Sequence, residues 1–132
     1  LPDLMDIYEG KKIHLERAKG EEPFVIRCNH ALAQIMVSNL VKNSLLHNRE
    51  GGELHIVTTA SSLIIKNSGE HPLDGEKLFR RFYRGIDGKK DSTGLGLAIA
   101  RSIALSASLS LTYKWQEGMH LFLLVKEPQK KS

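Results

Sequence analysis

Three short polar segments of this chain have side chains that could bind a phosphorylated ligand. Asn39 and Asn43 lie four residues apart, so on a helix their amides share one face. Gly94 and Gly96 precede a stretch rich in Ala and Leu, and glycines at a helix start let backbone N–H groups approach phosphate. Asn67 opens an Asn-Ser-Gly stretch that equally suits a plain turn. Each signal alone is weak, because paired asparagines are more often surface or capping residues.

The bulk composition fits one compact domain, expected to span residues 1–132. The net charge of +4 fits a solvated basic surface or an anionic ligand, and it is too small to indicate nucleic acid by itself. Cys28 is the single cysteine, so no internal disulfide is possible, and we expect it to pack as a small buried residue. The sequence has no bilayer-length apolar stretch and no signal peptide, and it begins with Leu1, so we expect an excised fragment.

Hydrophobic periodicity predicts two helices, at Ala31–Leu46 and from Leu95 to about Ala107. Asn29 is the expected N-cap of the first helix. Its core-facing residues are expected to be Leu32, Ile35, Met36, Leu40 and Val37. Extended segments are predicted at Lys12–Arg17, Pro23–Cys28, Leu54–Thr59, Leu63–Lys66, Leu109–Lys114 and His120–Val125.

Polar or glycine-bearing stretches connect these elements. Asn67–Gly75 is expected to be irregular, Leu78–Tyr83 to be a short aromatic helix or turn, and Gly85–Thr93 to be a mobile loop. Antiparallel hairpins combined with helices indicate an α+β fold. We expect a two-layer α/β sandwich whose mixed, mostly antiparallel sheet is covered on one face by about three helices.

Four segments in a fixed order resemble the catalytic domain of sensor histidine kinases, within the superfamily that includes the gyrase, Hsp90 and MutL ATPases. The resemblance covers roughly Ala31 to Val125 and implies the Bergerat-type ATP-binding fold. The segments are Asn39-Leu40-Val41-Lys42-Asn43-Ser44 (N box), Ile64-Ile65-Lys66-Asn67-Ser68-Gly69 (G1 box), Leu78-Phe79-Arg80-Arg81-Phe82-Tyr83-Arg84 (F box) and Ser92-Thr93-Gly94-Leu95-Gly96-Leu97 (G2 box).

The resemblance also implies roles for individual residues toward ATP and Mg²⁺. Asn43 would ligate the magnesium ion, Asn39 would line the phosphate end, and Asn67 would accept a hydrogen bond from the adenine amino group. Arg84 would reach the terminal phosphate, so Asn39 and Arg84 are the expected catalytic residues. Phe79 and Phe82 would pack at the base of the ATP lid. The expected nucleotide-binding residues are Asn39, Asn43, His47, Asn67, Gly69, Phe82, Tyr83, Arg84, Thr93, Gly94, Leu95, Gly96 and Leu97.

Three positions depart from the family pattern. Asn67 stands where the family usually has aspartate, which removes charge from the adenine hydrogen bond and predicts binding weaker by roughly tenfold. Leu46 replaces a phosphate-contacting lysine, for which His47 or Lys42 could substitute. Ser92 replaces the first glycine of the last segment.

The expected activity is that of a protein-histidine kinase. An amide at Asn39 cannot act as the general base that hydrolytic relatives use there, so transfer to another acceptor is favoured over hydrolysis. By resemblance, the acceptor is a histidine on a separate dimerisation domain, through which the parent protein forms a homodimer, and a response regulator follows. We expect a cytoplasmic domain whose parent is anchored in the bacterial inner membrane, with no nucleic-acid partner. Two alternatives stay open: a degenerate docking module without nucleotide, and a basic nucleic-acid binder.

Overall fold

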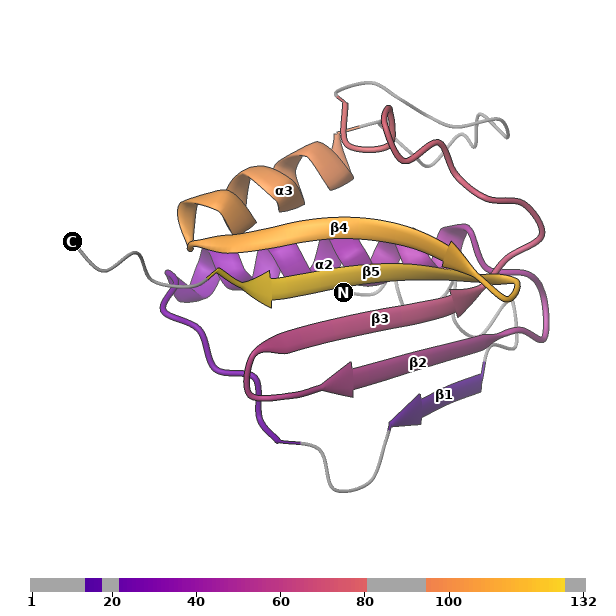
Figure 1. Cartoon of the computed structure of the whole chain (residues 1–132), viewed down its shortest axis with the longest axis horizontal. Coiled ribbons are helices and arrows are strands. Elements are labelled where there is room, and N and C mark those ends of the chain that lie inside the picture. Colours follow the sequence, from indigo (N-terminus) through magenta and orange to yellow (C-terminus); the bar gives the residue numbers. More distant parts are fainter. Residues whose placement is uncertain (1–13, 18–21, 81–94, 128–132) are drawn as a thin grey trace.

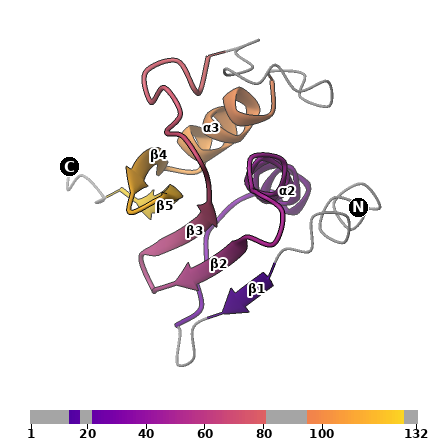
Figure 2. The ribbon, with the colours of Figure 1, turned by 90° about the vertical axis from the view of Figure 1, so that its right-hand side faces the viewer.

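The computed structural model describes residues 14–17, 22–80 and 95–127. Two helices, α2 (His30–Leu46) and α3 (Gly96–Ser106), lie on one face of a five-stranded sheet (Figures 1 and 2). The strands are β1 (His14–Arg17), β2 (Glu53–Thr58), β3 (Ser62–Ser68), β4 (Leu109–Gln116) and β5 (Met119–Lys126). The expected two-layer α+β sandwich is confirmed, and the described residues contain two of the about three helices expected.

The sheet is mixed and mostly antiparallel, in the order β1-β2-β3-β5-β4. Only β1 and β2 pair in parallel, whereas β2–β3, β3–β5 and β5–β4 are antiparallel. The last strand therefore lies between β3 and β4. The β4–β5 hairpin turns tightly because Glu117 and Gly118 both adopt positive φ values, of 52° and 75°, which is the geometry that two-residue hairpin turns favour.

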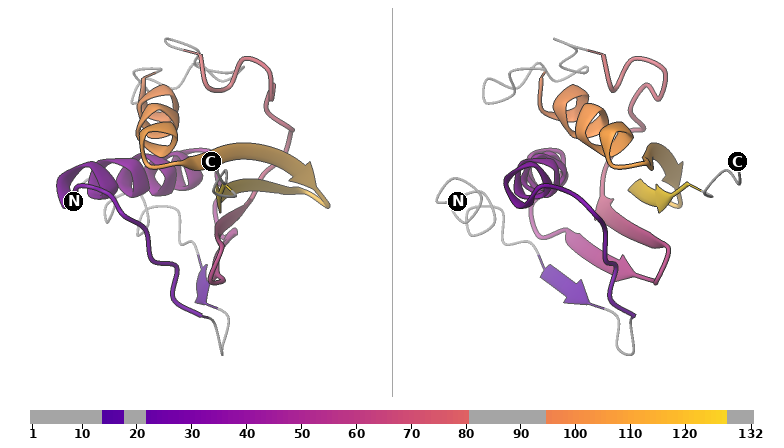
Figure 3. Two further views of the ribbon diagram at one scale, coloured as in Figure 1. Left: turned by 60° about the vertical axis from the view of Figure 1, so that its left-hand side comes forward. Right: turned by 90° about the vertical axis from the view of Figure 1, so that its left-hand side faces the viewer.

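The buried stripe of α2 begins later than the sequence predicts. The Asn29 side chain caps the helix by accepting hydrogen bonds from the N–H groups of Ala31 and Leu32, as expected. Met36 and Leu40 are buried, but the predictions for Leu32, Ile35 and Val37 are wrong, since these residues are 41%, 45% and 38% exposed. The first turns of α2 extend past the strands (Figure 3, left), so they have no sheet to pack against.

Two other local predictions are corrected. Pro23–Cys28 forms no strand, and proline lacks the N–H group that a ladder requires. Cys28 is half-buried against the core rather than fully buried. Strand β3 runs through Ser68, so Asn67 is the second-last residue of a strand rather than the first residue of an irregular stretch. Two-sided pairing of Asn67 with Leu54 and His120 holds that residue in the sheet.

One core lies between the helices and the sheet. Its buried members are Met36, Leu40, Leu45, Leu54, Ile65, Leu78, Leu97, Ala100, Ile103, Ala104, Leu109, Leu111, Phe122 and Leu124. Leu78 belongs to a run of turns after Asp74, and the half-buried Phe79 packs against the same core. Leu46 is also buried, so its side chain cannot replace the phosphate contact of the lysine that the family has at this position. Among the described residues, no helix combines the length and apolarity needed to cross a membrane.

Candidate functional site

Asn39 and Asn43 lie on the part of α2 that faces α3 and the sheet, and both are half-buried. The Asn39 side chain lies against the start of α3, since a Cβ atom added to Gly96 would be 3.4 Å from Asn39 Oδ1. Asn43 Oδ1 is buried and has no hydrogen-bond partner among the residues that the structure describes. An unsatisfied buried amide oxygen is costly and rare in native proteins, so this oxygen is a candidate contact for a ligand.

Asn67 at the end of β3 presents a second such oxygen. Its side chain is fully buried, and Nδ2 donates to the Ser68 carbonyl at 3.2 Å. Rotating the amide would place an oxygen against that carbonyl, so the hydrogen bond fixes which end of the amide is the acceptor. Oδ1 is then left buried without a partner in the described part of the chain. Asn67 therefore offers an acceptor in a fixed direction.

The start of α3 completes the arrangement. Among the residues that the structure describes, no side chain caps this helix, and its first turn contains no acidic residue. Its first backbone N–H groups thus retain the partial positive charge that attracts anions. Gly96 lets the Asn39 side chain approach this end closely, while Leu97 is buried in the core.

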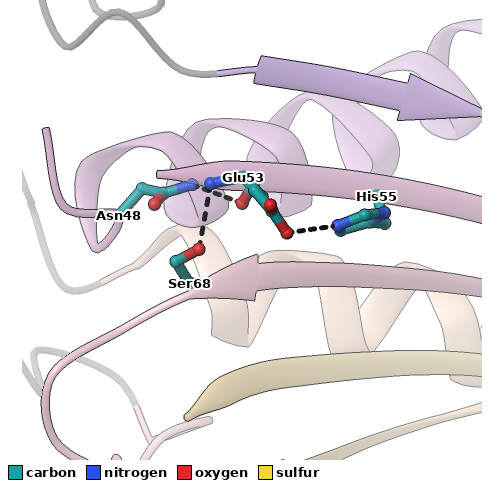
Figure 4. A network of polar contacts seen from close by, with 4 residues as sticks. All are labelled: Asn48, Glu53, His55 and Ser68. Carbon is teal, nitrogen blue, oxygen red and sulfur yellow. Dashed lines mark hydrogen bonds and ion pairs between the residues drawn. The ribbon is translucent and has the colours of Figure 1, made fainter. Parts of the chain in front are cut away.

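A hydrogen-bond network joins the end of α2 to the end of β3 (Figure 4). Asn48 Nδ2 donates to the Glu53 carbonyl at 2.9 Å, and the Glu53 N–H donates to Ser68 Oγ at 2.9 Å. The Glu53 carboxylate contacts His55 Nε2, also at 2.9 Å. The network fixes the strand residue that follows Asn67 relative to the helix that bears Asn39 and Asn43.

A second polar cluster lies beside Asn67 on the β4–β5 hairpin. The Tyr113 hydroxyl is 2.8 Å from His120 Nδ1, and it accepts a hydrogen bond from the Leu73 N–H at 2.9 Å. Burial, and then the positive charge of His47 at the C-cap of α2, lower the pKa of His120 to about 4. Burial raises the pKa of Tyr113, partly offset by the Leu73 N–H. His120 is therefore neutral near pH 7.

Acidification is expected to destabilise the fold through His120. The unfolded residue takes up a proton near its ordinary pKa of 6.5, whereas the folded one does so only near 4. The folded state binds fewer protons in this window, so the free energy of unfolding falls as the pH drops, by on the order of 3 kcal/mol from this group. Urea unfolding of the wild type and His120→Gln across this range measures the effect. Identical pH slopes in both proteins would exclude His120 as the responsible group.

The predicted site residues are brought together in part. Asn39 lies against Gly96, next to Leu95, where α2 meets the start of α3, and Asn43 follows one turn later on α2. On the sheet side, Gly69 lies against His120, and His47 influences His120 electrostatically. The other predicted residues, Phe82, Tyr83, Arg84, Thr93 and Gly94, lie outside the described residues.

Sequence reasoning missed several polar residues around this site, namely Asn48, Ser68, Tyr113 and His120. A usable signal was present for two of them. Alternation along the β4–β5 hairpin places Tyr113 and His120 on the same face as the buried Leu111 and Phe122. Nothing in the local sequence signals the Asn48 and Ser68 hydrogen bonds, because they join segments separated along the chain.

The family model described as histidine kinase-, DNA gyrase B- and HSP90-like ATPase matches residues 29–129. The chain belongs to this ATPase family. The match contains both described helices and both hairpins. The expectation of a histidine kinase-type ATPase domain is thereby confirmed.

Curated relatives of this ATPase domain are sensor histidine kinases. HprS of Escherichia coli (strain K12) is 32% identical over 111 residues, covering 75% of this chain and 25% of HprS. YvrG of Bacillus subtilis (strain 168) is 34% identical over 105 residues, covering 73% of this chain and 16% of YvrG. The chain thus spans a quarter or less of the length of these two relatives.

Solved structures share the fold. The catalytic domain of the histidine kinase ThkA, in a nucleotide-free form, superposes with a TM-score of 0.69 at 22% identity, covering 94% of this chain and 90% of that chain. The mycobacterial sensor histidine kinase MprB gives a TM-score of 0.73 at 18% identity, covering 97% and 93%.

Proposed function

We propose that this domain binds Mg-ATP and donates the γ-phosphoryl group to a histidine on a separate dimerisation domain of a two-component sensor kinase. Residues 1–132 would form one catalytic domain of a longer protein that dimerises through the other domain and serves a response regulator. The domain would work in the cytoplasm, with its parent anchored in the inner membrane. One observation carries the proposal: Asn43 and Asn67, on α2 and β3 of a histidine kinase-type ATPase fold, each hold a buried amide oxygen without a described partner.

The two amide oxygens suit the two ends of the nucleotide. The Asn67 oxygen, directed by the Ser68 carbonyl, would accept the adenine amino group. The Asn43 oxygen is a hard donor that fits magnesium, an ion that proteins usually bind through one or two side chains together with substrate phosphates and water. The ion would neutralise charge on the phosphates. Asn39 and the start of α3 would line the phosphate end, and Arg84 would reach the terminal phosphate.

Phosphoryl transfer rather than hydrolysis follows from the side chain at position 39. An amide at neutral pH cannot take a proton from water, so Asn39 would position the phosphates without generating a nucleophile. A histidine acceptor needs no such base, because a ring nitrogen of the neutral imidazole has a lone pair that can attack the phosphorus. The bond between the γ-phosphorus and its bridging oxygen breaks, a P–N bond forms, and the imidazole loses its N–H proton to solvent or a base on its own domain.

Titration calorimetry of the whole chain with a magnesium complex of a non-hydrolysable ATP analogue tests the binding step. We expect a saturable heat, and phosphate transfer when a histidine-bearing dimerisation domain is added with ATP. No heat at millimolar ligand would overturn the proposal and favour the docking module. DNA binding that weakens steeply with salt would favour the nucleic-acid alternative.

Restoring the acid with Asn67→Asp is expected to tighten ATP binding by about tenfold, because charge assistance strengthens the adenine hydrogen bond. The structure also predicts a loss of stability in this variant. The carboxylate loses the donor to the Ser68 carbonyl and is fully buried, so we expect the nucleotide-free protein to lose about 1–3 kcal/mol of stability. Calorimetry and urea unfolding measure the two effects. An unchanged dissociation constant would mean that position 67 does not touch the base.

A further inference from the structure

The backbone that follows Asn67 is held in place by two side chains of the β4–β5 hairpin. The Leu73 N–H donates to the Tyr113 hydroxyl at 2.9 Å. The His120 ring lies against Gly69 so closely that a Cβ atom there would overlap Nε2, which explains the glycine at this position. The Gly69 N–H also donates to the Gly118 carbonyl at 3.1 Å. Residues 69–73 are thus attached to the hairpin at both ends.

The two hairpin side chains are also bonded to each other. Tyr113 Oη and His120 Nδ1 are 2.8 Å apart. Because His120 is neutral, its Nδ1 can accept the phenolic proton while the same phenolic oxygen accepts the Leu73 N–H. This gives a directed relay from Leu73 through Tyr113 to His120. The relay is enclosed, since His120 is 2% exposed and Tyr113 is half-buried between the rings of His120 and Phe122.

The relay is next to the amide that offers the base acceptor. Asn67 and His120 are register partners on neighbouring strands, so their side chains lie on the same face of the sheet. Directly opposed Cβ atoms are about 5 Å apart. The residues that the relay holds begin two positions after Asn67. A shift of residues 69–73 would therefore move the Ser68 carbonyl, which sets the direction of the Asn67 amide.

We propose that Tyr113 and His120 are positioning residues for base recognition, which hold residues 69–73 and so aim the Asn67 acceptor at an exocyclic amino group. This inference rests on the proposed nucleotide function and deepens it. The consequence is selectivity: ATP has an amino group at this position of the base, whereas inosine triphosphate has a carbonyl oxygen there. Loss of the relay would reduce the preference for ATP over inosine triphosphate and leave the contacts to the phosphates unchanged.

The test is Tyr113→Phe in the whole chain, with affinities for the magnesium complexes of ATP and inosine triphosphate measured by calorimetry well below the melting temperature. The wild type is expected to prefer ATP by about tenfold. In the variant we expect this preference to fall by about threefold or more, with the inosine triphosphate affinity within about twofold of wild type. Amide exchange at Leu73 should accelerate, because its acceptor is gone.

Trp115→Phe is the matched control, because Trp115 lies on the same strand as Tyr113 and packs against the His120 ring but is not part of the relay. It should keep the wild-type preference. An unchanged preference in Tyr113→Phe would overturn the inference while leaving the proposed function standing. A wild type that binds both nucleotides equally would also overturn it, by removing the Asn67 role, and a wild type that binds neither would overturn the proposed function itself.

Discussion

Asn43→Ala is expected to weaken magnesium-dependent ATP binding by about 10- to 100-fold, the loss that follows from removing one contact to a charged group. The substitution deletes a buried oxygen that has no described protein partner, so it leaves no newly unsatisfied group behind. Alanine also favours the helix in which Asn43 lies. The fold should therefore be retained. Calorimetry with the ATP analogue, in magnesium and again in a chelator, measures the effect.

The magnesium dependence is the decisive part of that experiment. Wild type and variant should differ in magnesium and agree within about threefold in the chelator, because only the metal contact is lost. Gln34→Ala is the matched control, an amide removed from an exposed position of the same helix, and it should behave as wild type. Equal affinities of Asn43→Ala and wild type in magnesium would show that the ion is held elsewhere.

Asn67→Leu is expected to weaken ATP binding while leaving the free energy of unfolding nearly unchanged. Leucine has the same branched outline, and it replaces a fully buried amide whose oxygen has no described partner. Removing an unsatisfied acceptor offsets the lost hydrogen bond to the Ser68 carbonyl, so the free energy of unfolding should stay within about 1 kcal/mol of wild type. ATP affinity should nevertheless fall by about tenfold or more, because the base loses its acceptor.

Ser68→Ala provides the contrast in urea unfolding. Ser68 Oγ accepts the Glu53 N–H within the network that ties α2 to the sheet, and Ser68 is buried, so the loss of this acceptor should cost about 1–3 kcal/mol. A residue kept for function and a residue kept for structure should thus separate in one assay. If Asn67→Leu lowered the free energy of unfolding as much as Ser68→Ala, position 67 would have a structural role in place of the proposed one.

Local patterns predicted the elements of this fold well. Asn29 caps α2 as expected, and both hairpins lie where apolar alternation and turn residues place them. The errors occur where a neighbouring element decides the outcome. Helical spacing shows that Leu32 and Ile35 share a face with the core residues, but it does not show that the sheet ends before reaching them. Asparagine disfavours strands, yet pairing on both sides holds Asn67 in β3.

In the candidate site, too, the residues on one element could be predicted from the sequence, whereas contacts between distant segments could not. Asn39 and Asn43 are neighbours on one helix, so sequence spacing was enough to place them together. The relay from Leu73 to Tyr113 and His120 depends on a contact across 40 residues of chain, which no local pattern contains. The Asn67 amide could be named from the sequence, but its direction depends on the Ser68 carbonyl and so required the structure.

The position of β5 between β3 and β4 has a consequence for the order in which the sheet can form. β3, which bears Asn67, has β2 on one side and β5 on the other, and β5 is separated from it by α3 and β4 along the chain. A nascent chain leaving the ribosome would expose one ladder edge of β3 until Met119–Lys126 had been translated. The proposed base acceptor on β3 would therefore gain its second ladder partner only after β5 has been made.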